Sequence, residues 1–379
     1  MRTTIVSMIA VMVFLGASAA TGWADDRLVQ PRPEADQTAE GFSWYDAQDI
    51  GIEGQGWKDV DQPYDRLPAK AKEMVRSAVW ELSRDSSGML VRFKTDATTI
   101  AARWSLTSER LAMPHMPATG VSGLDLYVRD QAGRWRWLAV GRPTAFPQNT
   151  ATLVRGLPAG TREYLLYLPL YNGVLRVEVG VPREAELFAV SPPHDRRPIV
   201  FYGTSITHGA CASRPGMVHT AILGRRLEYP VVNLGFSGNG RMEIEVGRLM
   251  AELDASAYVI DCLPNLTADQ VAERTEPLVR VLRQARPDVP ILLVEDRTYA
   301  DAFLVTGKRE RNESSRRALR SAYQRLQAAG VSGLHYLEGE GLLGDDGEAT
   351  VDSSHPTDLG FFRQAAAFEP PLRRMLALP

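Results

Sequence analysis

The chain has 379 residues, which is enough for about two domains of ordinary size. Apolar residues make up 44% of it and charged residues 23%, a balance typical of folded soluble proteins that excludes wholesale disorder. The formal net charge is −3 and no block of Lys or Arg occurs, so neither a nucleic acid nor an anionic membrane surface is expected as a partner.

The first 24 residues predict a secretory signal peptide. Arg2 supplies the positive n-region, residues 5–20 are apolar, and Gly22-Trp-Ala24 provides a small-x-small cleavage site. The apolar run is shorter than the roughly 20 residues that a membrane span needs. An uncleaved anchor is the alternative interpretation. We expect cleavage after Ala24, a periplasmic or extracellular mature protein, and no stable membrane insertion after cleavage.

The next part of the chain predicts short strands. Alternating or β-branched runs are separated by turn segments such as residues 85–88 and 130–133. Runs of this kind with few helical segments are typical of an antiparallel β-sandwich. We predict a sandwich domain over residues 25–190 and a proline-rich linker at 191–198. The predicted strands are residues 78–82, 89–94, 100–106, 124–129, 134–140, 163–168 and 174–179.

From residue 199 to 379 the pattern changes to alternating strands and helices. This alternation predicts a parallel sheet that is covered by helices on both faces, a three-layer α/β/α domain. The predicted strands are residues 199–202, 231–236, 258–263, 291–295 and 334–337. The predicted helices are residues 217–227, 242–253, 268–285 and 309–329, with a terminal helix after Pro356.

Three of these strands end in segments suited to acyl transfer. They lead into Gly203-Thr-Ser205, Ser-Gly238-Asn-Gly and Leu-Pro-Asn265. In a parallel sheet such ends meet at one edge, where open α/β folds bind their ligands. Ser205 could be a nucleophile, while its own N–H, the Gly238 N–H and the Asn265 amide could hold the oxyanion of a tetrahedral intermediate.

A base and its orienting carboxylate follow far downstream. Asp352 and His355 stand three residues apart, before Pro356. Serine is a weak nucleophile that needs such a base within hydrogen-bond reach. The order Ser, Asp, His therefore indicates a serine hydrolase that requires no cofactor.

The two cysteines do not indicate a metal site. Cys211 and Cys262 are not accompanied by a His/Cys cluster with ligand spacing, so no metal is expected. In an exported protein they could form a disulfide or remain two buried thiols.

Together these segments resemble the SGNH (GDSL-type) hydrolases, whose four blocks carry Ser, Gly, Asn and an Asp-x-x-His pair in this order. Gly123-Leu-Asp-Leu-Tyr127 is similar to the GxDLY signature of a subgroup that has an N-terminal β-sandwich. The resemblance covers nearly the whole mature chain and implies a flavodoxin-like sheet in the second domain.

The resemblance also implies the roles of the site residues. Ser205 is the implied nucleophile, His355 the general base and Asp352 the residue that orients the imidazole. Gly238 and Asn265 complete the implied oxyanion hole together with the Ser205 N–H.

Two positions depart from the family pattern. Thr204 stands where the family has Asp, but that Asp is not the acid of the triad. Leu263-Pro264 stands before Asn265 where many members have Gly-Gly, which bears on the size of the pocket rather than on the type of reaction.

Each candidate also has a purely structural interpretation. Ser205 and Gly238 could be turn residues, and Asn265 could cap the helix that begins near residue 267. Asp352 and His355 could belong to a surface loop before the last helix. The presence of all four blocks in order favours catalysis.

Further segments near the predicted site allow two interpretations each. His208 and His219 could line a pocket, although structural roles are favoured. Residues 295–299 could bind a polar substrate or form internal ion pairs. The sandwich loops 113–117 and 170–174 could reach over the catalytic edge or be ordinary connections.

Two tryptophans of the sandwich are also ambiguous. Trp135 and Trp137 alternate along one predicted strand and so share a face. They could stack on a sugar ring or pack into a core, and packing is favoured.

The sequence thus predicts an exported serine esterase for short-chain esters, such as O-acetyl groups, of a carbohydrate or another polar small molecule. An acyltransferase with the same triad is the alternative. A glycan-binding protein with a vestigial hydrolase domain is the other class of function to be distinguished. The oligomeric state does not follow from the sequence.

Overall fold

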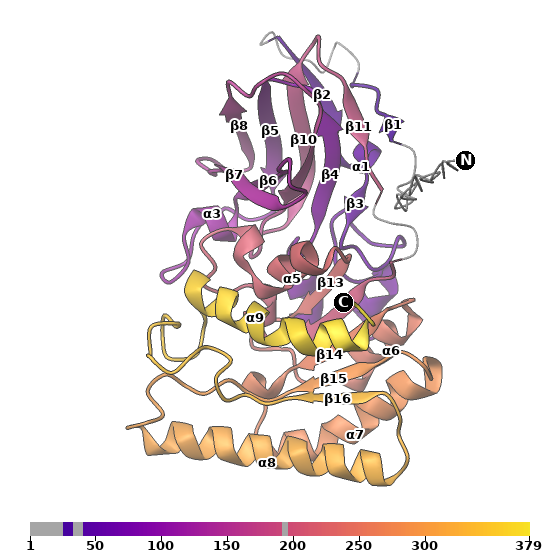
Figure 1. The fold of residues 1–379 in the computed structure, drawn as a ribbon, viewed down its shortest axis with the longest axis vertical. Helices are drawn as coiled ribbons and strands as arrows, with labels where there is room; N and C mark the ends of the chain where they lie inside the picture. Colours follow the sequence, from indigo (N-terminus) through magenta and orange to yellow (C-terminus); the bar gives the residue numbers. More distant parts are fainter. Residues whose placement is uncertain (1–25, 33–40, 192–195) are drawn as a thin grey trace, which may run out of the picture.

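The computed structural model describes residues 26–32, 41–191 and 196–379. The predicted signal peptide, and residues 192–195 of the predicted linker, lie outside the described residues. In the described ranges, no helix is both long and apolar enough to cross a membrane. Antiparallel strands occupy the upper part of the molecule in Figure 1, and a helix-covered parallel sheet lies below them.

The upper part is a β-sandwich. Its strands are β1 (Arg27–Leu28), β2 (Phe42–Asp46), β3 (Ile52–Glu53), β4 (Leu90–Thr95), β5 (Thr99–Leu106), β6 (Leu124–Arg129), β7 (Trp135–Gly141), β8 (Gln148–Arg155), β9 (Arg162–Tyr167), β10 (Val174–Pro182) and β11 (Leu187–Ala189). One sheet has the order β1-β11-β4-β9-β6-β7, with β3 paired to β4, and the other has the order β2-β10-β5-β8. Both sheets contribute to one core, in which Phe93 and Tyr164 of the first sheet lie with Trp104 and Val177 of the second. The antiparallel sandwich that was predicted is confirmed.

One predicted strand of the sandwich is wrong. Residues 78–82 belong to the helix α2 (Ser77–Ser83), in which Val79, Trp80 and Ser83 are buried. These residues recur every three to four positions, which is the spacing of one helix face. The run is too short for that spacing to be separated from a strand by sequence alone.

Below the sandwich, five parallel strands form the sheet of the second half. They are β12 (Ile199–Gly203), β13 (Val231–Gly235), β14 (Ala257–Asp261), β15 (Ile291–Val294) and β16 (Leu334–Leu337). Their order is β13-β12-β14-β15-β16, the flavodoxin-like order that was expected. The helices are α4 (Ser205–His208), α5 (His219–Leu227), α6 (Ile244–Glu252), α7 (Ala268–Ala285), α8 (Thr306–Ala328) and α9 (Asp358–Met375).

The residues of each strand divide between the two faces of this sheet. On one face, Ile199 and Phe201 pack with residues of α5 and α9. On the other face, Val200 and Tyr202 pack with residues of α6, α7 and α8. Strands β12 to β15 are nearly continuous apolar runs because both of their faces are buried.

The second face is also covered by a segment from the first half of the chain. Trp57, Leu67, Val79 and Trp80 share one core cluster with the strands and helices of the lower half. This segment includes α2 and a 3-10 turn at Ala69–Glu73. The predicted division at residues 191–198 stays a prediction, but the core of the lower half includes residues from the first half of the chain.

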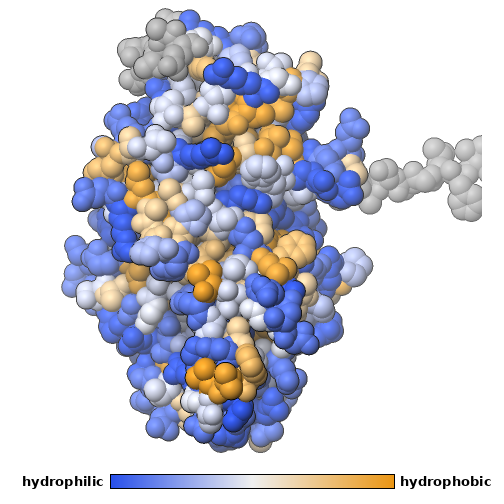
Figure 2. Space-filling model, turned by 90° about the vertical axis from the view of Figure 1, so that its left-hand side faces the viewer, coloured by the Kyte–Doolittle hydropathy of each residue, from blue (hydrophilic) through white to orange (hydrophobic). Residues whose placement is uncertain are grey.

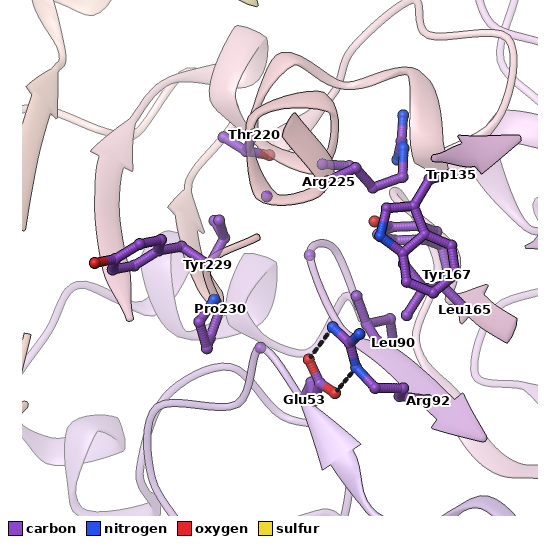
Figure 3. Close-up of a pocket in the computed structure, with 15 residues that line it drawn as sticks. Glu53, Leu90, Arg92, Trp135, Leu165, Tyr167, Thr220, Arg225, Tyr229 and Pro230 are labelled. Atoms are coloured by element: carbon purple, nitrogen blue, oxygen red, sulfur yellow. Dashed lines mark hydrogen bonds and ion pairs between the residues drawn. The ribbon is translucent and has the colours of Figure 1, made fainter. Parts of the chain in front are cut away.

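A cavity lies where the sandwich meets α5 (Figure 3). Leu90, Arg92 and Trp135 line it from the sandwich, and Thr220 and Arg225 line it from the helix. Its Arg92 forms an ion pair with Glu53 at 2.6 Å. None of the predicted catalytic residues lines this cavity, so it belongs to the junction between the two halves.

The remaining short helices are α1 (Ala47–Ile50) and α3 (Ala118–Val121), with 3-10 turns at Pro215–Met217 and Leu263–Asn265.

Candidate active site

Ser205 stands where the central strand β12 turns into α4. The Thr204 hydroxyl caps this short helix by accepting the Ile206 N–H at 3.3 Å. Gly203 is required at the end of the strand, because a Cβ there would lie 2.0 Å from Thr207 Oγ1. Ser205 is only 7% exposed. The turn therefore holds its hydroxyl at the carboxyl edge of the sheet.

The structure brings Ser205, His355 and Asp352 together as one hydrogen-bonded chain. Ser205 Oγ lies 2.8 Å from His355 Nε2, and His355 Nδ1 lies 2.7 Å from Asp352 Oδ2. The second carboxylate oxygen of Asp352 accepts the backbone N–H groups of Ser354 at 3.1 Å and His355 at 2.8 Å. Asp352 thus fixes both the turn and the ring that the turn carries.

The electrostatics of Asp352 favour this arrangement. Burial raises the pKa of Asp352, but the hydrogen bonds from the backbone and ring of His355 outweigh burial and hold that pKa below its ordinary value. An ionised Asp352 keeps the proton on His355 Nδ1. The Nε2 atom is then free to accept the proton of Ser205.

The second loop packs directly on the first. The Asn239 and Gly240 N–H groups both donate to the Phe236 carbonyl at 2.8 Å and close a turn around Gly238, whose φ is +68°. A Cβ on Gly240 would lie 1.8 Å from the Gly203 carbonyl oxygen. The close approach of the two loops therefore requires glycine at 240, and the positive φ favours it at 238.

Asn265 faces this second loop and does not cap α7. Thr267 caps that helix: its hydroxyl accepts the Gln270 N–H at 3.3 Å, and the Gln270 side chain accepts the Thr267 N–H at 3.1 Å. In one orientation of its amide, the Asn265 oxygen accepts the N–H groups of Asn239 at 3.2 Å and Gly240 at 3.3 Å. The other orientation offers only a 3.4 Å contact with the Gly240 carbonyl. The first orientation satisfies more groups and leaves the Asn265 NH₂ as a donor.

Two loops of the sandwich reach the catalytic edge. The Tyr171 hydroxyl donates to the Ser205 carbonyl at 3.2 Å. The ring of His115 lies 6.4 Å from the ring of His355. The sequence could not decide whether these loops reach the catalytic edge, because no sequence motif predicts contacts between residues of different domains.

The other histidines near Ser205 are structural. His208 is fully buried, stacks on Tyr171 at 4.1 Å and lies 3.3 Å from Asp85. His219 is buried among Phe201, Phe361 and Phe368. Burial lowers the pKa of both rings, which keeps them neutral.

The charged segment after β15 forms internal ion pairs. Arg297 pairs with Asp261 at 2.7 Å, and both side chains are at most 1% exposed. Glu295 accepts hydrogen bonds from Arg320 at 2.9 Å and Tyr336 at 2.5 Å. These contacts favour the structural interpretation of residues 295–299 over substrate binding.

The structure also distinguishes between the alternatives for the tryptophans and for the cysteines. Trp137 is 50% exposed, so it does not lie in the sandwich core. The Trp135 indole donates to Glu228 at 3.1 Å. Cys211 and Cys262 are free and buried, and burial raises the pKa of Cys211 to about 12.

Two family models match the chain. Residues 42–187 match the GxDLY N-terminus of SGNH hydrolase-type esterases, and residues 196–373 match the GDSL-like lipase/acylhydrolase family. No curated protein matches the sequence significantly.

Solved structures show the same architecture. A candidate GDSL-like lipase from Bacteroides ovatus is 32% identical, with 89% of this chain and 99% of that chain covered and a TM-score of 0.84. A salicylyl-acyltransferase from a tetracycline biosynthetic pathway is 21% identical, with 93% and 97% covered and a TM-score of 0.67. A family two carbohydrate esterase from Clostridium thermocellum is 17% identical, with 77% and 93% covered and a TM-score of 0.57. The last two share the fold. The chain thus belongs to the GDSL-like lipase/acylhydrolase family, with the N-terminal domain of its GxDLY subgroup, and is a hydrolase that acts on ester bonds.

Proposed function

We propose that the chain is an exported serine esterase that removes short acyl groups, O-acetyl above all, from a carbohydrate or another polar compound. The observation that carries this proposal is the unbroken chain of hydrogen bonds from Ser205 through His355 to Asp352. Export rests on the signal peptide that residues 1–24 predict.

The geometry supports a two-step mechanism. His355 Nε2 takes the proton of Ser205 while Oγ attacks the ester carbonyl, and Asp352 stabilises the imidazolium. The Ser205 N–H, the Gly238 N–H and the Asn265 NH₂ are the proposed donors to the oxyanion. The alcohol leaves with the proton from His355. Water, activated by the same ring, then attacks the acyl-enzyme and releases the acid and free Ser205.

Support for a polar substrate comes from the fold. The left-hand side of the molecule in Figure 1, which faces the viewer in Figure 2, is mostly hydrophilic, with separate apolar patches. The fold that the chain shares with a family two carbohydrate esterase agrees with an acylated glycan as the substrate.

Acyl transfer is the second candidate, and the fold shared with a salicylyl-acyltransferase favours it. The triad and oxyanion donors would be the same, but an alcohol would replace water in the second step. Adding increasing concentrations of a sugar alcohol during turnover separates the two. An acyltransferase forms the new ester in proportion to the acceptor, whereas an esterase forms free acid.

The deciding experiment is hydrolysis of nitrophenyl esters from acetyl to long acyl chains by the mature protein. We expect the fastest turnover for acetyl, a decline with chain length, and loss of nearly all activity in Ser205→Ala, because the nucleophile is gone. Ser332→Ala is the matched control: Ser332 is exposed and precedes β16 at the opposite edge of the sheet. Equal rates for Ser205→Ala and the mature protein would show that Ser205 is not the nucleophile.

A further inference from the structure

The GxDLY signature lies at the junction of the two halves rather than in the catalytic centre. Asp125 of β6 is fully buried, and its carboxylate accepts the Trp137 indole N–H at 2.9 Å. The same carboxylate accepts Arg214 Nη1 and the Gly216 N–H, both at 2.8 Å. Arg214 and Gly216 belong to the lower half. The signature aspartate therefore binds the loop that follows the nucleophile helix.

The signature tyrosine holds the same loop. Arg214 Nη1 also donates to the Tyr127 hydroxyl at 2.5 Å. A Cβ on Gly216 would lie 2.4 Å from the Tyr127 ring and 2.8 Å from the Asp125 carboxylate. A glycine is thus needed for the loop to lie this close to β6.

A second contact from the sandwich fixes the loop one residue earlier. The Thr119 hydroxyl donates to the Ser213 carbonyl at 2.6 Å. The neighbouring Gly120 allows the Ala212 carbonyl to approach, since a Cβ there would lie 2.3 Å from that oxygen. The sandwich therefore forms a hydrogen bond with Ser213 and packs closely against the residue before it.

Ser213 in turn holds the start of α9. Its N–H donates to Asp358 Oδ1 at 2.9 Å and its hydroxyl donates to Asp358 Oδ2 at 2.5 Å. Asp358 is the first residue of α9 and follows His355 by three positions. Pro356 pairs with Thr350, and the His355 carbonyl accepts the Val351 N–H at 2.9 Å, so the intervening chain is short and constrained.

We propose that the sandwich positions the general base: Asp125 and Tyr127 fix the loop 213–216, and Ser213 fixes Asp358 and thereby the turn that carries His355. The inference rests on the proposed function, because it assigns His355 as the base of the Ser205 reaction. Asp125, Tyr127, Ser213 and Asp358 are positioning residues that do not touch the reacting atoms.

The first test is the kcat for nitrophenyl acetate in Asp358→Ala and Asp358→Asn. Because displacements of about 1 Å can cost roughly 100-fold in rate, we expect Asp358→Ala to lower kcat by at least about tenfold. KM should stay within about twofold, because Asp358 does not contact the substrate. Asp358→Asn can still accept the Ser213 N–H, so it should recover most of the kcat.

Glu369→Ala is the matched control on the same helix. Glu369 pairs with Arg226 of α5 at 3.2 Å and with Arg373 at 2.9 Å, but it does not contact the loop 213–216. It should keep the wild-type kcat. A folded Asp358→Ala variant with unchanged kcat would overturn the proposal. If Asp358→Ala does not fold, Ser213→Ala replaces it, because this variant removes only the hydrogen bond from the Ser213 hydroxyl to Asp358. An unchanged kcat in folded Ser213→Ala would then overturn the proposal.

A double-mutant cycle tests the part played by the sandwich. Asp125→Asn and Asp358→Ala should each lower kcat, and the double variant should lose less than the product of the two effects, because both act along one route. Effects that multiply would overturn the role of the sandwich. Tyr127→Phe replaces Asp125→Asn in the cycle if that variant does not fold.

A proton NMR measurement separates this inference from the proposed function. The His355 Nδ1–H bonded to Asp352 should give a resonance far downfield. It should broaden or vanish in Asp358→Ala, because a turn no longer tied to the loop 213–216 exposes this proton to exchange with water, but persist in Asp358→Asn and Glu369→Ala. This readout needs no turnover. If Ser205→Ala kept its activity, the proposed function would fail, while the positioning of His355 would still be decided by this signal.

Discussion

Asp352 accepts hydrogen bonds through both of its oxygens, and this explains why a short motif was enough to predict its pairing with His355. One oxygen orders the backbone of the turn and the other orders the imidazole. A pair spaced by three residues can make both bonds within one turn, so the geometry is local and the sequence predicts it. The partnership with Ser205 is not local, and only the presence of the other blocks pointed to it.

The residues that the sequence left ambiguous were decided by burial and by neighbours far away in the chain. His208 became structural through Asp85 and Tyr171, two residues of the sandwich half. His115 gained its position beside His355 in the same way. No spacing rule relates such pairs, because sequence separation does not determine distance in space.

At the scale of single residues, we expect Asn265 to donate a hydrogen bond to the oxyanion. Asn265→Ala should lower kcat by about 10²–10³ with little change in KM, because the NH₂ group would act on the charge of the transition state. Asn265→Asp keeps the oxygen that accepts from Asn239 and Gly240 but replaces the donor by a charge, so it should be at least as slow. Steady-state kinetics with nitrophenyl acetate measures both.

Gln270→Ala is the control for this prediction. It removes half of the capping box of α7, close to Asn265, without touching the proposed oxyanion site. It should lower the free energy of unfolding by about 0.5–1.5 kcal/mol, the net contribution of one hydrogen bond, and leave kcat unchanged. A kcat for Asn265→Ala equal to that of Gln270→Ala would show that Asn265 acts only on stability.

At the scale of elements, the parallel sheet was easier to predict than the sandwich. All five parallel strands were predicted because they stand between long helical patterns, and four of them, β12 to β15, are largely buried on both faces. The edge strands β2 and β8 of the sandwich were missed. Gln148–Arg155 has mixed polarity and mixed exposure, so it lacks the clean alternation of a half-buried strand.

The close contact between the loop that follows β12 and the loop that follows β13 leads to a testable prediction. Gly240→Ala would place a Cβ 1.8 Å from the Gly203 carbonyl and push the loop of Gly238 away from Ser205. We expect a loss of kcat of more than about tenfold together with a lower melting temperature, because the loops must separate.

Gly307→Ala is the matched substitution in α8. A Cβ there meets no atom within 4 Å, and Ala favours the helix over Gly by up to about 1 kcal/mol. It should keep kcat and keep or raise the melting temperature. Full activity in Gly240→Ala would mean that the two loops can separate without harm to the proposed oxyanion hole.

At the scale of the whole molecule, the two halves are joined by more than the predicted linker. Arg66 is 1% exposed and its guanidinium donates to the carbonyls of Asn233 at 3.1 Å and Gly235 at 2.7 Å, at the end of β13. Trp57 and Trp80 fill one face of the same sheet. The two family models divide the chain by sequence, but the core does not follow that division.

The isolated second half, residues 196–379, is therefore expected to misfold. Losing one buried Trp costs about 3–5 kcal/mol, and the lower half loses two together with Leu67 and Val79, against a total stability of about 5–15 kcal/mol. Circular dichroism and dye binding should show a loosely packed state without esterase activity.

The control is the chain from residue 25 to 379, cut after folding at a protease site placed in the predicted linker. Its halves should stay associated and active, because the contacts between them remain. A fully active, cooperatively unfolding 196–379 fragment would refute the shared core.

The shared core also sets an order of events while the chain is being made. Synthesis runs from the N-terminus, so residues 57–83 appear before the whole of the sandwich from β4 onward and before the first strand of the sheet that they cover. Trp57 and Trp80 therefore lack their packing partners in the parallel sheet while the rest of the sandwich is being synthesised. Contacts so distant in sequence slow folding and leave apolar surface open to wrong partners. We therefore expect the nascent chain to be most prone to aggregation after its sandwich is complete and before β12 and β13 have been synthesised.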